Sequence, residues 1–107
     1  GARQLAMMKP GAVLIQASRG GIVNETALAA HINSGHLGGA AVDVYSTEPP
    51  DTDNPLFAIE GDAARRVLFT PHVAGVTRQS FASLFREAWT NVERVVVRGE
   101  APQNRVY

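Results

Sequence analysis

Three short apolar runs, separated by polar and glycine-rich segments, predict three strands. They cover residues 12–15, 37–44 and 67–69. Their apolar residues follow one another without alternation, which is typical of parallel strands covered on both faces. Residues 47–54 contain prolines and acids and predict a loop, and residues 62–66 predict a polar connector.

Helices are expected between and around these strands. Asn24 is a suitable N-cap for a helix that runs to about Ser34 and ends at Gly35. A short helix over residues 1–8 would stop before Pro10. Over residues 77–98 the apolar positions follow the i, i+3, i+4, i+7 spacing of an amphipathic helix. We interpret its aromatic residues as core rather than as a cofactor surface; they are Phe81, Phe85 and Trp89.

The order strand, helix, strand, connector, strand, helix predicts an α/β fold with a parallel sheet. Three strands alone would leave two sheet edges unpaired. We therefore expect residues 1–107 to be part of a larger, doubly wound, Rossmann-like sheet.

Composition narrows the function classes. Ten basic residues balance ten acidic ones, so the chain has no electrostatic signature of nucleic-acid or membrane binding. No apolar run approaches the roughly 20 residues of a membrane helix. Cysteine is absent, which fits a reducing compartment, and we expect a cytoplasmic protein. The three histidines have no metal-ligand spacing, so no metal site is expected.

Polar residues with useful chemistry follow each predicted strand. Arg19 follows the first strand, Asp43 lies at the end of the second with Glu48 beyond it, and His72 follows the third. Ligands of open parallel sheets bind beyond the carboxyl ends of the strands. Taken singly, each residue has an ordinary explanation as a solvated turn or loop residue. Their convergence at one sheet edge favours a site that binds an anion and moves a proton.

Four motifs, in order and spacing, resemble the D-isomer-specific 2-hydroxyacid dehydrogenases. They are Met8-Lys9-Pro10-Gly11-Ala12, Ser18-Arg19-Gly20-Gly21-Ile22-Val23, Asp43-Val44-Tyr45-Ser46-Thr47-Glu48-Pro49 and Thr70-Pro71-His72. The resemblance extends over essentially the whole chain. It implies an oxidoreductase that transfers a hydride between nicotinamide and a 2-hydroxyacid or 2-ketoacid.

The resemblance also implies roles for the catalytic residues. Arg19 would bind the substrate carboxylate or carbonyl oxygen, since its forked donors fit two oxygens. His72 would be the acid/base, and Glu48 would hold the imidazole and stabilise its charged form. Asn24 and Gln16 depart from the usual aspartate and asparagine. Both changes look conservative, and neither is expected to touch the triad.

The cofactor implied is NAD or NADP. Asp43 would contact its nicotinamide side, and the residues expected near the cofactor are Ala17, Ser18, Arg19, Asp43, His72, Ala74 and Gly75. The sequence contains no Gly-x-Gly-x-x-Gly fingerprint, which in this family lies upstream of Gly1. We therefore expect residues 1–107 to be the C-terminal portion of the NAD(P)-binding domain, without the fingerprint half and the substrate-binding domain.

Two other functions remain open. Dinucleotide-sensing transcriptional corepressors share this fold and triad, and an inactive fragment that associates with other chains would need none of the chemistry. For the enzyme, the resemblance implies a homodimer that acts on a small 2-hydroxyacid or 2-ketoacid.

Overall fold

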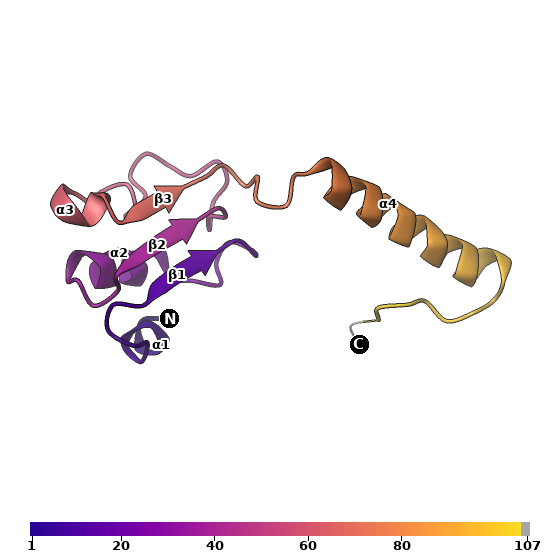
Figure 1. Cartoon of the computed structure of the whole chain (residues 1–107), viewed down its shortest axis with the longest axis horizontal. Coiled ribbons are helices and arrows are strands. Elements are labelled where there is room, and N and C mark those ends of the chain that lie inside the picture. The colour runs from indigo at the N-terminus through magenta and orange to yellow at the C-terminus, as the bar shows by residue number, and fades with distance from the viewer. Residues whose placement is uncertain (106–107) are drawn as a thin grey trace. The chain divides into compact units, whose positions relative to one another are not determined.

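The computed structural model describes residues 1–105, which belong to two compact units. Unit 1 is Gly1–Ala74 and unit 2 is Gly75–Tyr107. Each is described separately below, and Figure 1 labels their elements.

Unit 1 is built on a parallel sheet of three strands in the order β1-β2-β3. The strands are β1 (Val13–Gln16), β2 (Gly39–Val42) and β3 (Val67–Phe69). The predicted α/β fold with a parallel sheet is thus confirmed. β2 is shorter than the expected residues 37–44, because Leu37 N–H still bonds to the His31 carbonyl of α2 and ladder pairing extends only from Gly39 to Val42.

The helices of unit 1 are α1 (Ala2–Ala6), α2 (Glu25–Asn33) and α3 (Gly61–Ala64). Asn24 caps α2 as predicted, since its side chain accepts from the Ala27 N–H at 2.8 Å. Gly35 follows α2 with φ 76°, a left-handed conformation that glycine adopts without steric cost. The expectation of a polar connector over residues 62–66 is wrong, because α3 begins at Gly61 and occupies the connector as far as Ala64.

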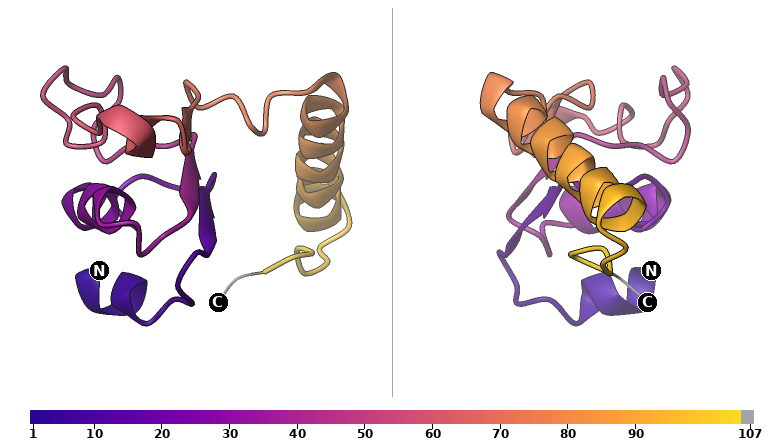
Figure 2. Two further views of the ribbon diagram at one scale, coloured as in Figure 1. Left: turned by 60° about the vertical axis from the view of Figure 1, so that its left-hand side comes forward. Right: turned by 90° about the vertical axis from the view of Figure 1, so that its right-hand side faces the viewer.

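The helices of unit 1 lie on one face of its sheet (Figure 2). Right-handed crossovers place successive connections on the same face when the strands run in sequence order. On that face Leu28, Ile32 and Leu37 are fully buried against Val42. On the other face Ile15 is 75% exposed, and Val13 and Leu68 are exposed as well. Unit 1 by itself therefore covers one face of its sheet, and the expected cover on the second face stays a prediction.

Arg66 ties the end of α2 to the start of β3. Its guanidinium donates to the carbonyl oxygens of Ile32 and Leu37, each at 2.9 Å, and lies 3.4 Å from that of Gly38. These carbonyls include one that the helix end leaves without an intrahelical partner. One side chain therefore closes the α2–β2 turn.

Unit 2 contains α4 (Arg78–Val92) and the π-helical turn η1 (Glu93–Val97). Thr77 caps α4 by accepting from the Ser80 N–H at 3.0 Å, and Gly99 follows η1 with φ 65°. No residue of α4 is buried, and Trp89 is 67% exposed. Unit 2 by itself therefore does not cover these aromatic residues, and their interpretation as core stays a prediction.

The segment after η1 folds back along the helix of unit 2. Asn91 accepts from the Gln103 N–H at 2.8 Å and donates to the Gln103 carbonyl at 3.3 Å. Arg94 forms an ion pair with Glu100 at 2.9 Å.

Across residues 1–105 no helix has the length and apolar character needed to cross a membrane.

Candidate active site

The carboxyl ends of the three strands lie side by side. Gln16 pairs with Val42, which in turn pairs with Phe69. The pairing continues one residue further, since Asp43 N–H donates to the Gln16 carbonyl and Thr70 N–H to the Val42 carbonyl. The segments that carry Arg19, Glu48 and His72 therefore leave the sheet at the same edge.

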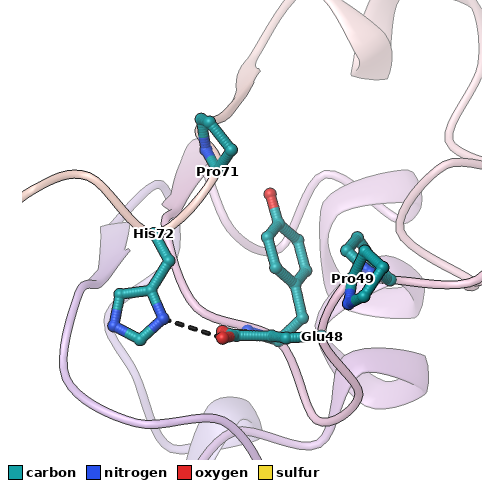
Figure 3. Close-up of a pocket in the computed structure, with 6 residues that line it drawn as sticks. Glu48, Pro49, Pro71 and His72 are labelled. Atoms are coloured by element: carbon teal, nitrogen blue, oxygen red, sulfur yellow. Dashed lines mark hydrogen bonds and ion pairs between the residues drawn. The ribbon is translucent and has the colours of Figure 1, made fainter.

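Glu48 and His72 are brought into direct contact (Figure 3). The distance from His72 Nδ1 to Glu48 Oε2 is 2.8 Å. An ionised carboxylate can only accept, so Nδ1 carries the hydrogen and Nε2 is left to exchange a proton with a ligand. The other carboxylate oxygen, Oε1, accepts from the Tyr45 N–H at 3.0 Å. Both oxygens of Glu48 are thus fixed by contacts within unit 1.

These contacts favour the charged form of Glu48. The hydrogen bond from His72, and then that from the Tyr45 N–H, lower the pKa of the Glu48 carboxyl below its ordinary value of 4.5. The carboxylate therefore stays negative at neutral pH and can stabilise positive charge on the imidazole.

The backbone at His72 is held in an uncommon conformation. Its φ is 55°, a left-handed value that costs a non-glycine residue roughly 1–2 kcal/mol. Asp43 Oδ1 accepts from the Thr70 hydroxyl at 2.6 Å and from the Val73 N–H at 2.9 Å, and Oδ2 accepts from the Ala74 N–H at 3.0 Å. The Asp43 carboxylate thus bonds to the chain on both sides of His72.

Asp43 is itself only 5% exposed. The Thr70 hydroxyl, with the Ala74 and Val73 N–H groups, lowers the pKa of the Asp43 carboxyl below 3.8, although burial opposes this shift. Its contact with a nicotinamide stays a prediction, and the contacts observed give it a role in shaping the turn that carries His72.

Arg19 lies on a turn shaped by Gln16. The Gln16 side chain donates to the Arg19 carbonyl at 2.8 Å and accepts from the Ser18 hydroxyl at 2.9 Å. The expectation that Gln16 leaves the triad untouched is therefore wrong, because it contacts the main chain of Arg19. Gly20 packs against the next loop, since a Cβ there would lie 1.8 Å from the Tyr45 carbonyl oxygen.

The guanidinium of Arg19 is not in contact with Glu48 or His72. Within residues 1–105 its one hydrogen bond goes to the Ser18 carbonyl at 2.7 Å. Its side chain is exposed, and its turn abuts the loop that carries Glu48. The structure thus brings together two of the three proposed catalytic side chains and sets the third on a neighbouring turn.

A cavity of about 140 Å³ adjoins the histidine–glutamate pair. Its lining consists of Tyr45, Glu48, Pro49, Pro50, Pro71 and His72. The buried Tyr45 hydroxyl lies 3.2 Å from the Val42 carbonyl and 3.1 Å from that of Thr70. Tyr45 therefore joins the ends of β2 and β3 beneath the pair, a role that the sequence did not indicate.

Three of the residues expected near a nicotinamide lie in unit 1. Ala17, Ser18 and Ala74 are small, exposed and located just beyond the strand ends. A Cβ at Gly75, the first residue of unit 2, would have no atom of another residue within 4 Å. Within residues 1–105 no group of three metal-binding side chains occurs.

A parallel α/β sheet with a histidine–carboxylate pair beyond the carboxyl ends of its strands places the chain in the class of open α/β proteins that bind ligands at that edge. More specifically, the chain belongs to the D-isomer specific 2-hydroxyacid dehydrogenase family. The model of the family's NAD binding domain matches residues 1–74, which coincide with unit 1. The resemblance found in the four motifs is thereby confirmed.

Two relatives illustrate the range of the match. The chain is 47% identical over 91 residues to a (S)-sulfolactate dehydrogenase from Chromohalobacter salexigens, covering 85% of this chain and 27% of that protein. It is 44% identical over 82 residues to a D-3-phosphoglycerate dehydrogenase from Escherichia coli, covering 75% of this chain and 19% of that protein.

A solved structure agrees with the fold. A D-isomer specific 2-hydroxyacid dehydrogenase from Xanthobacter autotrophicus, crystallised with NADPH and MES, matches with a TM-score of 0.78 and 34% identity. The match covers 100% of this chain and 41% of that one. The chain therefore spans less than half the length of each of these three relatives.

Proposed function

We propose that the protein carrying this chain is an NAD(P)-dependent dehydrogenase that interconverts a 2-hydroxyacid and a 2-ketoacid. The observation that carries the proposal is the 2.8 Å contact between His72 Nδ1 and Glu48 Oε2 at the carboxyl ends of the strands. Family membership supports it, because the family model describes an NAD binding domain of such dehydrogenases.

The mechanism follows from the chemistry of these side chains. The nicotinamide, when bound, supplies or accepts the hydride. His72 Nε2 donates a proton to the substrate oxygen in reduction and removes it in oxidation, while Nδ1–H stays bonded to Glu48. The carboxylate of Glu48 fixes the ring orientation and stabilises the imidazolium. Arg19, on the neighbouring turn, binds the substrate carboxylate.

The cofactor end that these residues suit is the nicotinamide. Ala17, Ser18 and Ala74 are small, exposed residues of unit 1 that follow β1 and β3, and we expect the ring to lie near them. The related enzyme from Xanthobacter autotrophicus was crystallised with NADPH, and the family description names NAD, so both cofactors stay within the proposal.

The remaining elements of the proposal concern the whole protein. We propose that residues 1–107 form the C-terminal portion of its NAD(P)-binding domain, and that it is a cytoplasmic homodimer. Its substrate would be a small 2-hydroxyacid or 2-ketoacid, and neither nucleic acid nor membrane is a partner. The relatives named above are dehydrogenases, and none of them supports the corepressor alternative.

Replacing His72 by Gln in the full-length protein tests this function. We expect turnover with a 2-ketoacid to fall roughly 10²–10⁴-fold, the usual contribution of a general acid/base. NADH affinity should change little, since the imidazole acts on the substrate oxygen. Turnover is followed by NADH absorbance, and affinity by fluorescence titration.

His31→Gln is the matched control, because His31 lies in α2 and takes no part in the pair with Glu48. It should keep wild-type turnover. Wild-type turnover of the His72 variant across the pH range would remove His72 from the reaction and overturn the proposed function.

A further inference from the structure

Glu48 lies in a loop without regular structure between Tyr45 and Asn54. Its side chain is 37% exposed and that of His72 is 47% exposed, so surrounding packing alone does not fix the pair. Surface loops are more mobile than the elements they connect. The Tyr45 N–H holds the carboxylate locally, and further contacts outside the loop determine where the loop as a whole lies.

A second carboxylate, Glu25, bonds to both ends of this loop. Glu25 Oε1 accepts from the Ser46 N–H at 2.7 Å, and Oε2 accepts from the Asn54 side-chain amide at 3.0 Å. Ser46 is two residues before Glu48, and Asn54 is six residues after it. Glu25 thus joins the two ends of the segment that presents the catalytic carboxylate.

The two hydrogen bonds that Glu25 accepts, from Ser46 and Asn54, form a clamp on this loop. Asn54 is itself fixed by the core of unit 1. Asn54 is 9% exposed, and its amide oxygen accepts from the Leu56 N–H at 3.0 Å. Leu56 is almost completely buried in the core of unit 1. Glu25 is fixed as well, because it belongs to the first turn of α2, directly after the N-cap Asn24. The loop is therefore fixed between a helix and the core.

We propose that Glu25 is a positioning residue for the histidine–glutamate pair. By holding Ser46 and Asn54 it fixes the loop, the loop fixes Glu48, and Glu48 orients the imidazole of His72. In this role Glu25 acts through the loop and not on the reacting atoms. This inference rests on the proposed function, because its effect is exerted through the catalytic pair.

Glu25→Gln in the full-length protein tests the proposal. Glutamine keeps the size but replaces one accepting oxygen by a donor, so it cannot accept from both Ser46 and Asn54. We expect kcat to fall roughly 10–100-fold, in line with the cost of a small displacement of catalytic groups. KM for NADH should stay near wild type, and the pH–rate profile should shift together with kcat.

Asn54→Asp tests the same clamp from the other side. It preserves shape and the acceptor for Leu56 N–H, but it sets a carboxylate against Glu25 in place of a donor. It should reproduce the loss of kcat, and it keeps the proposal falsifiable if Glu25→Gln folds poorly. Glu60→Gln is the control, because Glu60 is exposed at the start of α3 and forms no capping hydrogen bond.

A double-mutant cycle separates positioning from general stability. If Glu25 acts through Glu48, adding Glu25→Gln to Glu48→Gln should lower kcat by less than about twofold further, because residues in one network are not additive. Fully additive losses, or wild-type kcat in both clamp variants, would overturn the positioning role. The proposed function would survive that result, since it depends on the separate loss of turnover in His72→Gln.

Discussion

At the scale of single residues, each segment beyond a strand is shaped by the side chain of a polar residue outside the proposed catalytic triad. Gln16 forms the turn of Arg19, and Asp43 forms the turn of His72. Glu25 holds the loop of Glu48. Because hydrogen bonds to charged groups are stronger than neutral ones, the two carboxylates can keep their loops in one conformation.

The lowered pKa values of Glu48 and Asp43 predict a pH-dependent stability. Both carboxyls titrate below their ordinary values of 4.5 and 3.8 in the folded state, so the unfolded state binds more protons in acid. Their stabilisation is complete above about pH 4.5 and is lost as pH falls through the lower folded values. The free energy of unfolding should therefore decrease below that pH.

Urea denaturation of the full-length protein at a series of pH values measures this dependence of the free energy of unfolding on pH. Glu48→Gln and Asp43→Asn should each flatten the acidic decline, because each removes one titrating group. An acidic decline as steep as that of the wild type in both variants would show that other carboxyls cause it.

At the scale of elements, α2 organises unit 1 from both of its ends. Its first turn supplies Glu25 to the loop of Glu48, and its last turn is tied to β3 by Arg66. The helix therefore connects the site at the carboxyl ends of the strands with the turn at their opposite ends.

Replacing Arg66 by Lys tests the second connection. Lysine keeps the charge but lacks the planar fork that reaches the carbonyls of Ile32 and Leu37 together. We expect the free energy of unfolding to fall by about 1.5–3 kcal/mol, the usual value of hydrogen bonds to charged groups. The neighbouring, exposed Arg65 provides the control, and Arg65→Lys should change stability by less than about 0.5 kcal/mol. Equal effects of the two substitutions would contradict a clamp at Arg66.

At the scale of the whole molecule, both units expose apolar side chains. Unit 1 presents Val13, Ile15 and Leu68 on the open face of its sheet, and unit 2 presents Phe85 and Trp89 along α4. In addition, β1 pairs with β2 and with no other strand of the described sheet. Exposed apolar patches and unpaired strand edges favour association with another surface.

We therefore predict that the chain of 107 residues, produced alone, self-associates or folds poorly and binds NADH weakly. A Gly-rich turn at a helix N-terminus usually supplies the pyrophosphate contacts, and the sequence has no Gly-x-Gly-x-x-Gly. Light scattering measures the mass, and fluorescence titration measures NADH affinity. A well-folded monomer with micromolar affinity would contradict this prediction.

Much of the fold could be predicted because it depends on local signals. The continuous apolar runs located all three strands, and Asn24 and Gly35 marked the ends of α2. The helix α3 was not predicted, because it is a single turn of four residues and is too short to show a periodic pattern. The placement of the helices of unit 1 on one face of its sheet was also not predicted, because a run of apolar residues does not record which face the crossovers take.

The sequence by itself determined the α/β order, the family, and the appearance of Arg19, Glu48 and His72 after successive strands. Motif spacing and strand order carry that information, since carboxyl ends of parallel strands share one edge. The family resemblance also implied that Glu48 holds the imidazole of His72, as the structure shows. Only the tertiary structure decided that the Arg19 side chain stays apart from this pair, and that Glu25, Asp43 and Gln16 shape the loops. Those contacts depend on side-chain directions and on residues up to 31 positions apart, such as Asp43 and Ala74, and local pattern does not specify them.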